Sequence, residues 1–377
     1  MKKRLSVILL LAFALSVSGF SQKKNLTYQQ AYGDKRPRVI KPLPGITGWF
    51  DNDHYLETKT GDENRQVVKV EAATGKETTY LDYSVLNEKL DEGFDLNKSA
   101  TSTDDLQHFI LVKEMNLYYY NTSAGSLKQL TFSEALEKNP TFSPDNKRIA
   151  FTRENNLYVV DLVSGKETRL TNDGSELILN GYASWVYYEE ILGRGSRYRA
   201  FWWSPDASMI AYLRFDDSPV PEFPLFNADG VHGSLEITHY PKPGDSNPFV
   251  KLGIAHLNSG KTVWMETNED EDRYVAWPFW TIDSKELVYQ YMNRDQDEIT
   301  FFASNPNTGL VRSIYTEKQK SWVEFFEDVY VFEDGKGFIL RSDKSGWRNL
   351  YHYDLQGNLV NQITDFDWRV TGISMVD

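Results

Sequence analysis

The sequence contains no cysteine among its 377 residues, and this absence removes several kinds of structure at once. Without thiols the chain forms no disulfide, no thiolate metal site and no lipid-modified cysteine. The six histidines show no paired metal-ligand spacing. We therefore expect no metal site and no cofactor.

Clustered positive charge is also missing. The formal net charge is -13, and no group of lysines and arginines supplies the basic surface that a nucleic acid needs, so we expect no nucleic-acid partner. An acidic chain can still attract cationic peptide ends. The Gly-x-Ser-x-Gly pattern of a nucleophile elbow is absent too, and the sequence predicts no catalytic residue.

The one long apolar run lies at the N-terminus and is short for a spanning helix. Lys2, Lys3 and Arg4 precede an apolar stretch at residues 5–17, and Gly19-Phe20-Ser21 offers small residues for cleavage before Gln22. This pattern predicts a signal peptide at residues 1–21, hence a periplasmic or secreted protein. The alternative is an uncleaved membrane anchor, which normally needs about 20 apolar residues. Residues 22–45 are interpreted as a lead-in segment.

What the chain has in abundance is aromatic residues and regularly spaced turns. Aromatic residues make up 14% of the chain, a composition typical of β-structure. Pairs of strand-like runs are repeatedly joined by a turn that contains glycine, the residue that most easily adopts the positive φ of a tight hairpin. These glycines are Gly75, Gly125, Gly165, Gly260, Gly309 and Gly357, at intervals of 50, 40, 95, 49 and 48 residues. We interpret the interval of 95 residues as two units with one turn signal lost.

A second pattern lies between these hairpins. An aromatic strand end, a Ser-Pro-Asp type of turn and an apolar strand recur at residues 141–151, 202–212 and 280–289, with Asp145, Asp206 and Asp283 as turn residues. Units of about 40–50 residues made of strands and turns are typical of propeller blades. The sequence therefore predicts an all-β chain with an incomplete β-propeller of about seven blades at residues 46–377. An array of β-sandwiches is the alternative fold.

The regular repeat of strands and turns is interrupted at about residues 172–200, where we expect an insertion at a blade edge. The insertion carries two adjacent carboxylates, Glu189 and Glu190. Adjacent like charges repel each other, so a fold that holds both in one place usually has a cation between them. The free ammonium of a peptide is such a cation. The simpler alternative is an exposed acidic turn, since other acidic pairs occur in this chain.

Neighbouring residues allow more than one interpretation. Tyr188 could line a pocket beside the two carboxylates, although aromatic residues next to a strand are more often core residues. Arg194, Arg197 and Arg199 could pair with those carboxylates, contact another subunit or lie in a solvated loop.

These stretches together resemble the dipeptidyl peptidase IV family of serine peptidases. The resemblance rests on NGYASWVYYEE at 180–190, AFWWSPD at 200–206, IAYLRFD at 210–216 and YPKPG at 240–244. It extends over about residues 26–377. In that family an eight-bladed propeller is combined with an α/β-hydrolase domain, and the enzyme releases dipeptides from peptides with Pro or Ala in second place.

The resemblance also implies roles for individual residues. Glu189 and Glu190 match the paired glutamates that hold the substrate's N-terminal ammonium, and Phe326 matches an aromatic residue of the substrate pocket. The family's propeller arginine, which binds a substrate carbonyl, has no counterpart between Glu114 and Lys147. The hydrolase domain is expected C-terminal of Asp377, so that residues 1–377 alone would be inactive.

The sequence thus predicts the substrate-recognition propeller of an exported serine dipeptidyl peptidase that releases X-Pro or X-Ala dipeptides. Its partners would be peptides with a free N-terminus, and a homodimer is consistent with the family. Two alternatives stay open: a stand-alone periplasmic propeller that binds proteins or ligands, and a prolyl tripeptidyl peptidase relative.

Overall fold

The structure of the protein is a computed structural model that describes residues 25, 27–32, 43–61, 65–267, 272–374 and 376. The predicted signal peptide at residues 1–21 lies outside the described residues, as does most of the lead-in segment at 22–45. The chain divides into two units. One comprises Met1–Thr60 and Val67–Tyr80, and the other Gly61–Gln66 and Leu81–Asp377.

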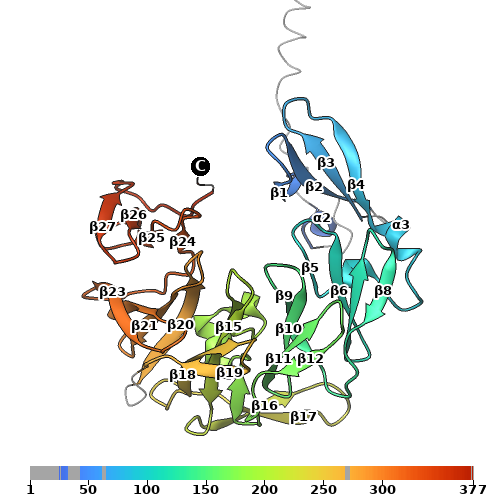
Figure 1. Cartoon of the computed structure of the whole chain (residues 1–377). Helices are drawn as coiled ribbons and strands as arrows, with labels where there is room; N and C mark the ends of the chain where they lie inside the picture. The colour runs from blue at the N-terminus through green and yellow to red at the C-terminus, as the bar shows by residue number, and fades with distance from the viewer. Residues whose placement is uncertain are drawn as a thin grey trace, which may run out of the picture. The chain divides into compact units, whose positions relative to one another are not determined.

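Antiparallel sheets dominate both units (Figure 1). The first sheet consists of β1 (Gly45–Trp49), β2 (His54–Thr60), β3 (Arg65–Glu71) and β4 (Glu77–Asp82). The second consists of β5 (Thr101–Ser102), β6 (His108–Lys113), β7 (Asn116–Asn121) and β8 (Ser126–Gln129). The third consists of β9 (Lys138–Phe142), β10 (Arg148–Arg153), β11 (Asn156–Asp161) and β12 (Glu167–Arg169).

The fourth sheet is larger, and a separate hairpin follows part of it in the chain. The sheet consists of β13 (Ile178–Asn180), β14 (Phe201–Trp203), β15 (Met209–Asp216), β18 (Phe249–His256) and β19 (Lys261–Trp264), and the hairpin of β16 (Glu222–Asn227) and β17 (Ser234–His239). The fifth sheet consists of β20 (Arg273–Trp280), β21 (Leu287–Asn293), β22 (Glu298–Ser304) and β23 (Val311–Lys318). The sixth consists of β24 (Tyr330–Val331), β25 (Phe338–Ser342), β26 (Asn349–Tyr353) and β27 (Leu359–Gln362).

These six sheets are propeller blades, and the predicted fold class is confirmed. All six predicted hairpin glycines lie between the third and fourth strands of a blade, with φ angles from +59° at Gly125 to +89° at Gly357. The Ser-Pro-Asp turns join the first strand to the second. Ser143, for example, donates its hydroxyl hydrogen bond to Asp145 at 2.6 Å, and Ser204 does the same to Asp206 at 2.6 Å.

The predicted number of blades, about seven, is wrong: the described ranges contain six. The interval between Gly165 and Gly260 is not two blades but one enlarged blade. Its extra length goes into a segment that interrupts the first strand and into the β16–β17 hairpin, which pairs only with itself. A repeat count from turn signals cannot separate an inserted hairpin from a missing blade.

Helical structure is sparse in the described part of the chain. It consists of α2 (Tyr28–Tyr32), α3 (Tyr83–Asn87), η1 (Leu96–Lys98), η2 (Tyr187–Ile191) and η3 (Arg194–Ser196). Asp82 caps α3 by accepting from the Ser84 amide at 3.0 Å. None of the helices in the described part of the chain has the length and apolar character that crossing a membrane requires.

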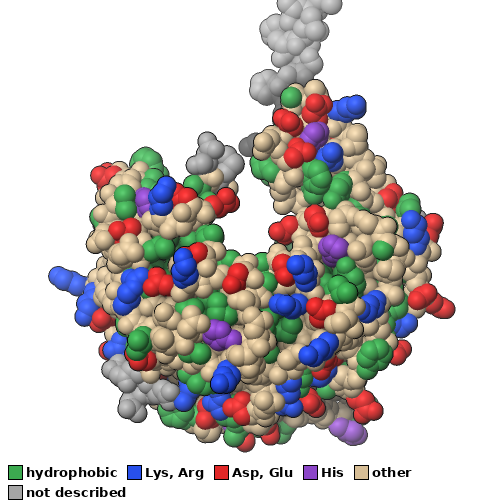
Figure 2. Space-filling model, in the orientation of Figure 1, with side chains coloured by type: hydrophobic (Ala, Val, Ile, Leu, Met, Phe, Trp, Pro, Cys, Tyr) green, Lys and Arg blue, Asp and Glu red, His purple; other side chains and the backbone are tan. Residues whose placement is uncertain are grey.

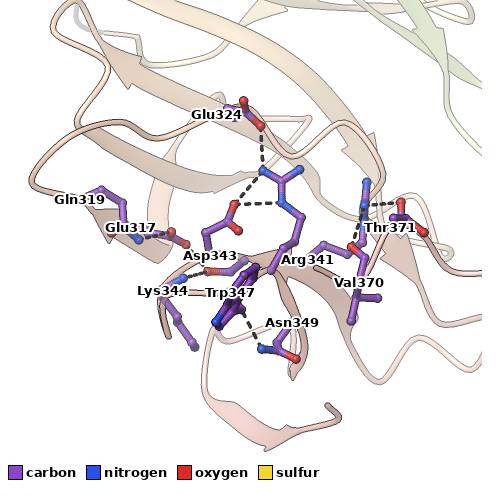
Figure 3. Close-up of polar contacts among 12 residues, drawn as sticks. Glu317, Gln319, Glu324, Arg341, Asp343, Lys344, Trp347, Asn349, Val370 and Thr371 are labelled. Atoms are coloured by element: carbon purple, nitrogen blue, oxygen red, sulfur yellow. Dashed lines mark hydrogen bonds and ion pairs between the residues drawn. The ribbon is translucent and has the colours of Figure 1, made fainter. Parts of the chain in front are cut away.

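Polar contacts join the fifth and sixth blades (Figure 3). Glu317 of β23 is buried and accepts hydrogen bonds from the Ser342 hydroxyl of β25 at 2.6 Å and from the Gln319 amide at 2.8 Å. Arg341 of β25 donates to the Val370 carbonyl at 3.3 Å, which holds the last described segment against this blade. A buried polar group costs free energy unless hydrogen bonds replace those it made with water, and the bonds from Ser342 and Gln319 do this for Glu317.

Candidate functional site: a helical turn with paired carboxylates

The site begins where the first strand of the fourth blade is interrupted. Asn180 pairs with Arg214 and Phe201 pairs with Tyr212, so the segment Gly181–Ala200 faces the single residue Leu213. Leu213 bonds to both ends of the segment: it accepts from the Gly181 amide at 2.9 Å and donates to the Ala200 carbonyl at 2.9 Å. The segment therefore leaves the blade and returns to it without shifting the strand register.

The base of this segment is closed by its own backbone. The Ala200 amide donates to the Gly181 carbonyl at 3.0 Å, and the Ala183 amide donates to the Tyr198 carbonyl at 2.8 Å. Gly181 has a φ of +69°, a conformation that glycine adopts without strain. The segment lies within the predicted insertion at 172–200 and arises from the first strand of the blade.

The carboxylates lie on a π-helical turn, η2. The Leu192 amide donates to the Tyr187 carbonyl at 2.7 Å, which is the wide i to i–5 bond of this geometry. Such turns are rare and often occur at functional sites, because they widen the helix to place particular side chains. The local sequence alone does not favour a π-turn, so contacts with the neighbouring blade must stabilise it.

Two aromatic side chains supply those contacts. Tyr187 is fully buried, and its hydroxyl accepts from the Val275 amide of β20 at 3.1 Å. Burial raises the pKa of this hydroxyl, which therefore stays protonated. At the other end of η2, the indole of Trp277 donates to the Ile191 carbonyl at 2.8 Å. The fifth blade thus holds the turn at both ends.

Glu189 and Glu190 lie beside each other on this turn but differ in their surroundings. The side chain of Glu189 is 14% exposed and pairs with the Arg194 guanidinium at 2.6 Å. Glu190 is exposed, and no described residue forms an ion pair or a hydrogen bond with its side chain. Among the described residues, Arg194 therefore forms a direct ion pair with Glu189 but not with Glu190, to which it is coupled only at longer range.

The cation on Glu189 is replaceable. Arg194 lies on η3 with 74% of its side chain exposed, and its hydrogen bond to Glu189 raises the pKa of the guanidinium. Solvent screens an ion pair in such a position, so it contributes little to stability. An incoming ammonium could take the place of Arg194 without breaking a buried contact.

Tyr188 is half-buried and belongs to a stack of tyrosines. Its ring stacks on Tyr198 with centroids 3.7 Å apart, and Tyr198 stacks on Tyr182 at 4.9 Å. Lys138 of the third blade lies over the Tyr182 ring, with its ammonium 4.3 Å from the centroid. Through Tyr188 this stack contacts η2, and whether Tyr188 also contacts a ligand stays a prediction.

Phe326 lies in the connection between β23 and β24 and is only 7% exposed. Its ring packs edge-on against Phe301 at 5.4 Å and Tyr315 at 5.9 Å, inside the same core cluster that contains Tyr187. The preceding Phe325 is more accessible, being half-buried. The predicted contact of Phe326 with a substrate stays a prediction.

Sequence reasoning missed a buried acid next to this segment. Asp217 follows β15 directly and is 5% exposed. Burial raises the pKa of its carboxyl to about 6, while the Ser184 hydroxyl and His239 act in the opposite direction. The backbone carbonyl of Ser184 accepts from the Tyr188 amide at 3.0 Å, at the start of the turn. The only signal in the sequence was the acidic pair at 216–217 directly after an apolar strand.

On the face drawn in Figure 2, charged side chains of both signs are distributed over the surface. Across the described ranges, no group of three or more His, Asp or Glu side chains could hold a metal ion. The basic side chains on the face in Figure 2 form no continuous patch. The acidic turn around residue 189 is therefore the feature that calls for a functional explanation.

Comparison with known proteins identifies the family. A family model described as the dipeptidyl peptidase IV (DPP IV) N-terminal region matches residues 94–377. The chain belongs to this family. Its match covers every described blade except the first, and it includes the interrupted fourth blade with Glu189 and Glu190.

Individual relatives of the dipeptidyl peptidase IV family extend this result. Dipeptidyl peptidase 4 of Trichophyton rubrum is 29% identical over 379 residues, covering 94% of this chain and 47% of that protein. Dipeptidyl peptidase 4 of Arthroderma otae is 27% identical over 380 residues, with the same 94% and 47% coverage. The crystal structure of Porphyromonas gingivalis dipeptidyl peptidase 4 matches with a TM-score of 0.75 at 26% identity, over 89% of this chain and 48% of that one. The chain thus spans about half the length of the relatives it matches.

Proposed function

We propose that this chain is the substrate-recognition propeller of an exported serine dipeptidyl peptidase that releases X-Pro or X-Ala dipeptides. The observation that carries the proposal is the π-turn at Tyr187–Ile191, which holds two adjacent carboxylates, of which Glu190 is exposed and has no direct ion pair with a described residue. The dipeptidyl peptidase names of the relatives support the same activity.

In this proposal Glu189 and Glu190 together bind the free ammonium of a peptide. Charge-assisted hydrogen bonds to both carboxylates fix the position of the amino end. Because the turn is held at both ends, the carboxylates do not shift when the ammonium binds. The distance from this site to a nucleophile then determines how many residues are released, and binding at the amino end positions the scissile bond.

The nucleophile would come from a hydrolase domain that follows Asp377. Acyl transfer of this kind uses a serine activated by histidine and aspartate, with backbone amides binding the oxyanion. Residues 1–377 contain no Gly-x-Ser-x-Gly pattern, so the isolated segment should not hydrolyse peptides. The relatives, which are about twice as long as this chain, are consistent with such an arrangement.

The test compares two substrates in the complete gene product: Gly-Pro p-nitroanilide and the same compound with an acetylated amine. The wild type should strongly prefer the free amine. Glu190→Gln and Glu189→Gln should each raise KM for the free-amine substrate, by the equivalent of about 2–5 kcal/mol if the carboxylates are desolvated in the complex. Asp104→Asn, which removes an exposed acid elsewhere, is the matched control.

The result also separates the alternatives. A stand-alone binding propeller would show no hydrolysis of either substrate. A tripeptidyl relative would release three residues from a longer peptide, which mass spectrometry of the products detects. Equal rates on free and acetylated substrates would contradict the role of Glu189 and Glu190.

Localisation is part of the proposal. Residues 1–21 would be removed on export, so the mature protein should begin at Gln22. Fractionation followed by N-terminal sequencing tests this. Recovery of an intact N-terminus in the membrane fraction would favour the anchored form.

A further inference from the structure

Gln290 of β21 occupies an unusual position. It is 0% exposed, and both ends of its side-chain amide bind the backbone of one distant residue. Its Oε1 accepts from the Phe326 amide at 2.9 Å, and its Nε2 donates to the Phe326 carbonyl at 2.8 Å. A buried polar side chain costs free energy unless it is fully hydrogen-bonded, and Gln290 uses its bonds to fix a connecting segment.

The backbone next to Gln290 is irregular. Ala276 pairs with Gln290 and Phe279 pairs with Val288, so Trp277 and Pro278 together face one residue, a β-bulge. Trp277 has a φ of +47°, which is uncommon for a bulky residue. Gln290 also reaches this bulge, because its Nε2 lies 3.5 Å from the Trp277 carbonyl. Bulges often redirect a side chain next to a functional site.

The redirected side chain reaches the carboxylate turn. The Trp277 indole donates to the Ile191 carbonyl at 2.8 Å, at the end of η2 that follows Glu190. A continuous chain of hydrogen bonds therefore runs from η2 through Trp277 and Gln290 to Phe326. It crosses from the fourth blade through the fifth to the connection that leads into the sixth.

We propose that Gln290 and Trp277 are positioning residues that set the spacing between the Glu189–Glu190 turn and the segment around Phe326. This inference rests on the proposed function, in which the turn binds a peptide's ammonium. With its amine fixed, a bound peptide can meet the 325–326 segment only if that segment is held at the correct distance. We call the chain of hydrogen bonds through Trp277 and Gln290 the relay. The relay determines that distance, and thereby how well the first residues of a peptide fit.

The bulge alone does not indicate a function, because the third blade has a similar one at Asn139 and Pro140. What is particular to the fifth blade is a tryptophan at the bulge whose indole bonds to Ile191, together with a fully buried glutamine that bonds to Phe326. Strained backbone that the surrounding structure maintains is a reason to look for a function. Here the strain places the indole where it can bind the turn that carries both carboxylates.

The test uses Gln290→Met and Trp277→Phe in the complete gene product, separately and together, with Gly-Pro p-nitroanilide as substrate. Methionine keeps the length of glutamine and removes both bonds to Phe326, whereas phenylalanine removes only the indole donor. Each single variant should raise KM about tenfold, since misplacement by about 1 Å can cost as much or more. The value of kcat should stay within about twofold.

The double variant tests the relay itself. Two residues in one chain of contacts are coupled, so the double variant should raise KM no more than the more affected single variant. Matched controls are Gln362→Met, where the amide donates to the Thr364 carbonyl at 2.7 Å, and Trp203→Phe, where the indole donates to the Thr141 carbonyl at 3.3 Å. Both controls should keep the wild-type KM.

Each outcome decides one question. A lower melting temperature with unchanged KM in both single variants, or KM effects that simply multiply in the double variant, would overturn the relay. If Gln290→Met does not fold, Trp277→Phe and its control decide the matter alone. If the wild type does not distinguish free from acetylated substrate, the proposed function fails, which is a separate result.

Discussion

The third and fourth blades start from the same strand pattern and differ at one point of the first strand. In the third blade, Thr141 pairs with Ala150 and Lys138 with Thr152, so Asn139 and Pro140 form a small bulge opposite Phe151. In the fourth blade the chain opens one strand position further on, opposite Leu213, and the whole segment Gly181–Ala200 is inserted.

The first strand of the fifth blade is irregular at the equivalent position. Its bulge at Trp277 and Pro278 faces Tyr289, which corresponds to Phe151 of the third blade. The first strand of three successive blades is thus interrupted at nearly the same level. The Gly181–Ala200 segment is thus an enlarged version of an irregularity that the neighbouring blades also contain. Four sets of substitutions test how independent this segment is of the rest of the propeller.

The largest effect is expected from truncating a buried aromatic ring in either blade. Tyr187→Ala in the segment and Phe151→Ala in the third blade should each lower the free energy of unfolding by about 3–5 kcal/mol, because both rings are fully buried. Denaturant unfolding measures this. Only Tyr187→Ala should also abolish the preference for a free amine. A normal preference in that variant would show that the turn needs no anchor.

The buried Asp217 of the fourth blade should make the free energy of unfolding depend on pH. Its folded pKa is raised to about 6 from 3.8, so the folded state binds the proton more tightly and stability falls as pH rises through that range. Relative to Asp217→Asn, the wild type should lose about 2 kcal/mol between pH 4 and pH 7.5. Unfolding curves of both proteins at these pH values measure the difference. A constant difference would contradict the raised pKa.

Removing the serine hydroxyl from the Ser-Pro-Asp turn should have the same effect in the third and the fourth blade. Ser143 accepts from the Arg148 amide and Ser204 from the Met209 amide, both at 3.0 Å, and both hydroxyls are buried. Ser143→Ala and Ser204→Ala should each cost about 1–2 kcal/mol of unfolding free energy. A much larger cost at Ser204 would mean that the inserted segment strains its own blade.

The hairpin glycines should give the smallest effect. Gly165 of the third blade and Gly260 of the fourth have φ angles of +72° and +67°. A Cβ at Gly260 would meet no atom within 4 Å, and at Gly165 only the flexible end of Lys128 at 3.7 Å. Alanine should therefore cost only about 1 kcal/mol at either site, from the backbone conformation alone. Thermal unfolding compares the two variants, and a difference above experimental error would show unequal turns.

The sequence predicted those parts of the molecule that depend on local chemistry. The hairpin glycines and the Ser-Pro-Asp turns were predicted correctly, because a positive φ and a hydroxyl-carboxylate bond leave a signature within a few residues. The paired carboxylates were predicted to lie in an insertion at about 172–200, and they lie on the Gly181–Ala200 segment between two stretches of one strand. The blade count was wrong because a hairpin inserted between strands resembles a blade without its turn signal.

The supporting residues of the site could not be predicted. Trp277 and Gln290 act through contacts with Ile191 and Phe326, which are far away in the sequence. Pro140 and Pro278 were the only local signs of the bulges, since proline inside a strand often marks such a site. Which residues a bulge contacts depends on how neighbouring blades pack, and no periodicity records that.

Because Leu213 alone lies opposite the interruption, the Gly181–Ala200 segment joins the blade at two adjacent points. A replacement segment with the same end-to-end spacing would preserve the strand pairings of the blade, provided that it also filled the core space of Tyr187. The length of this segment can therefore vary while the blade that carries it stays the same.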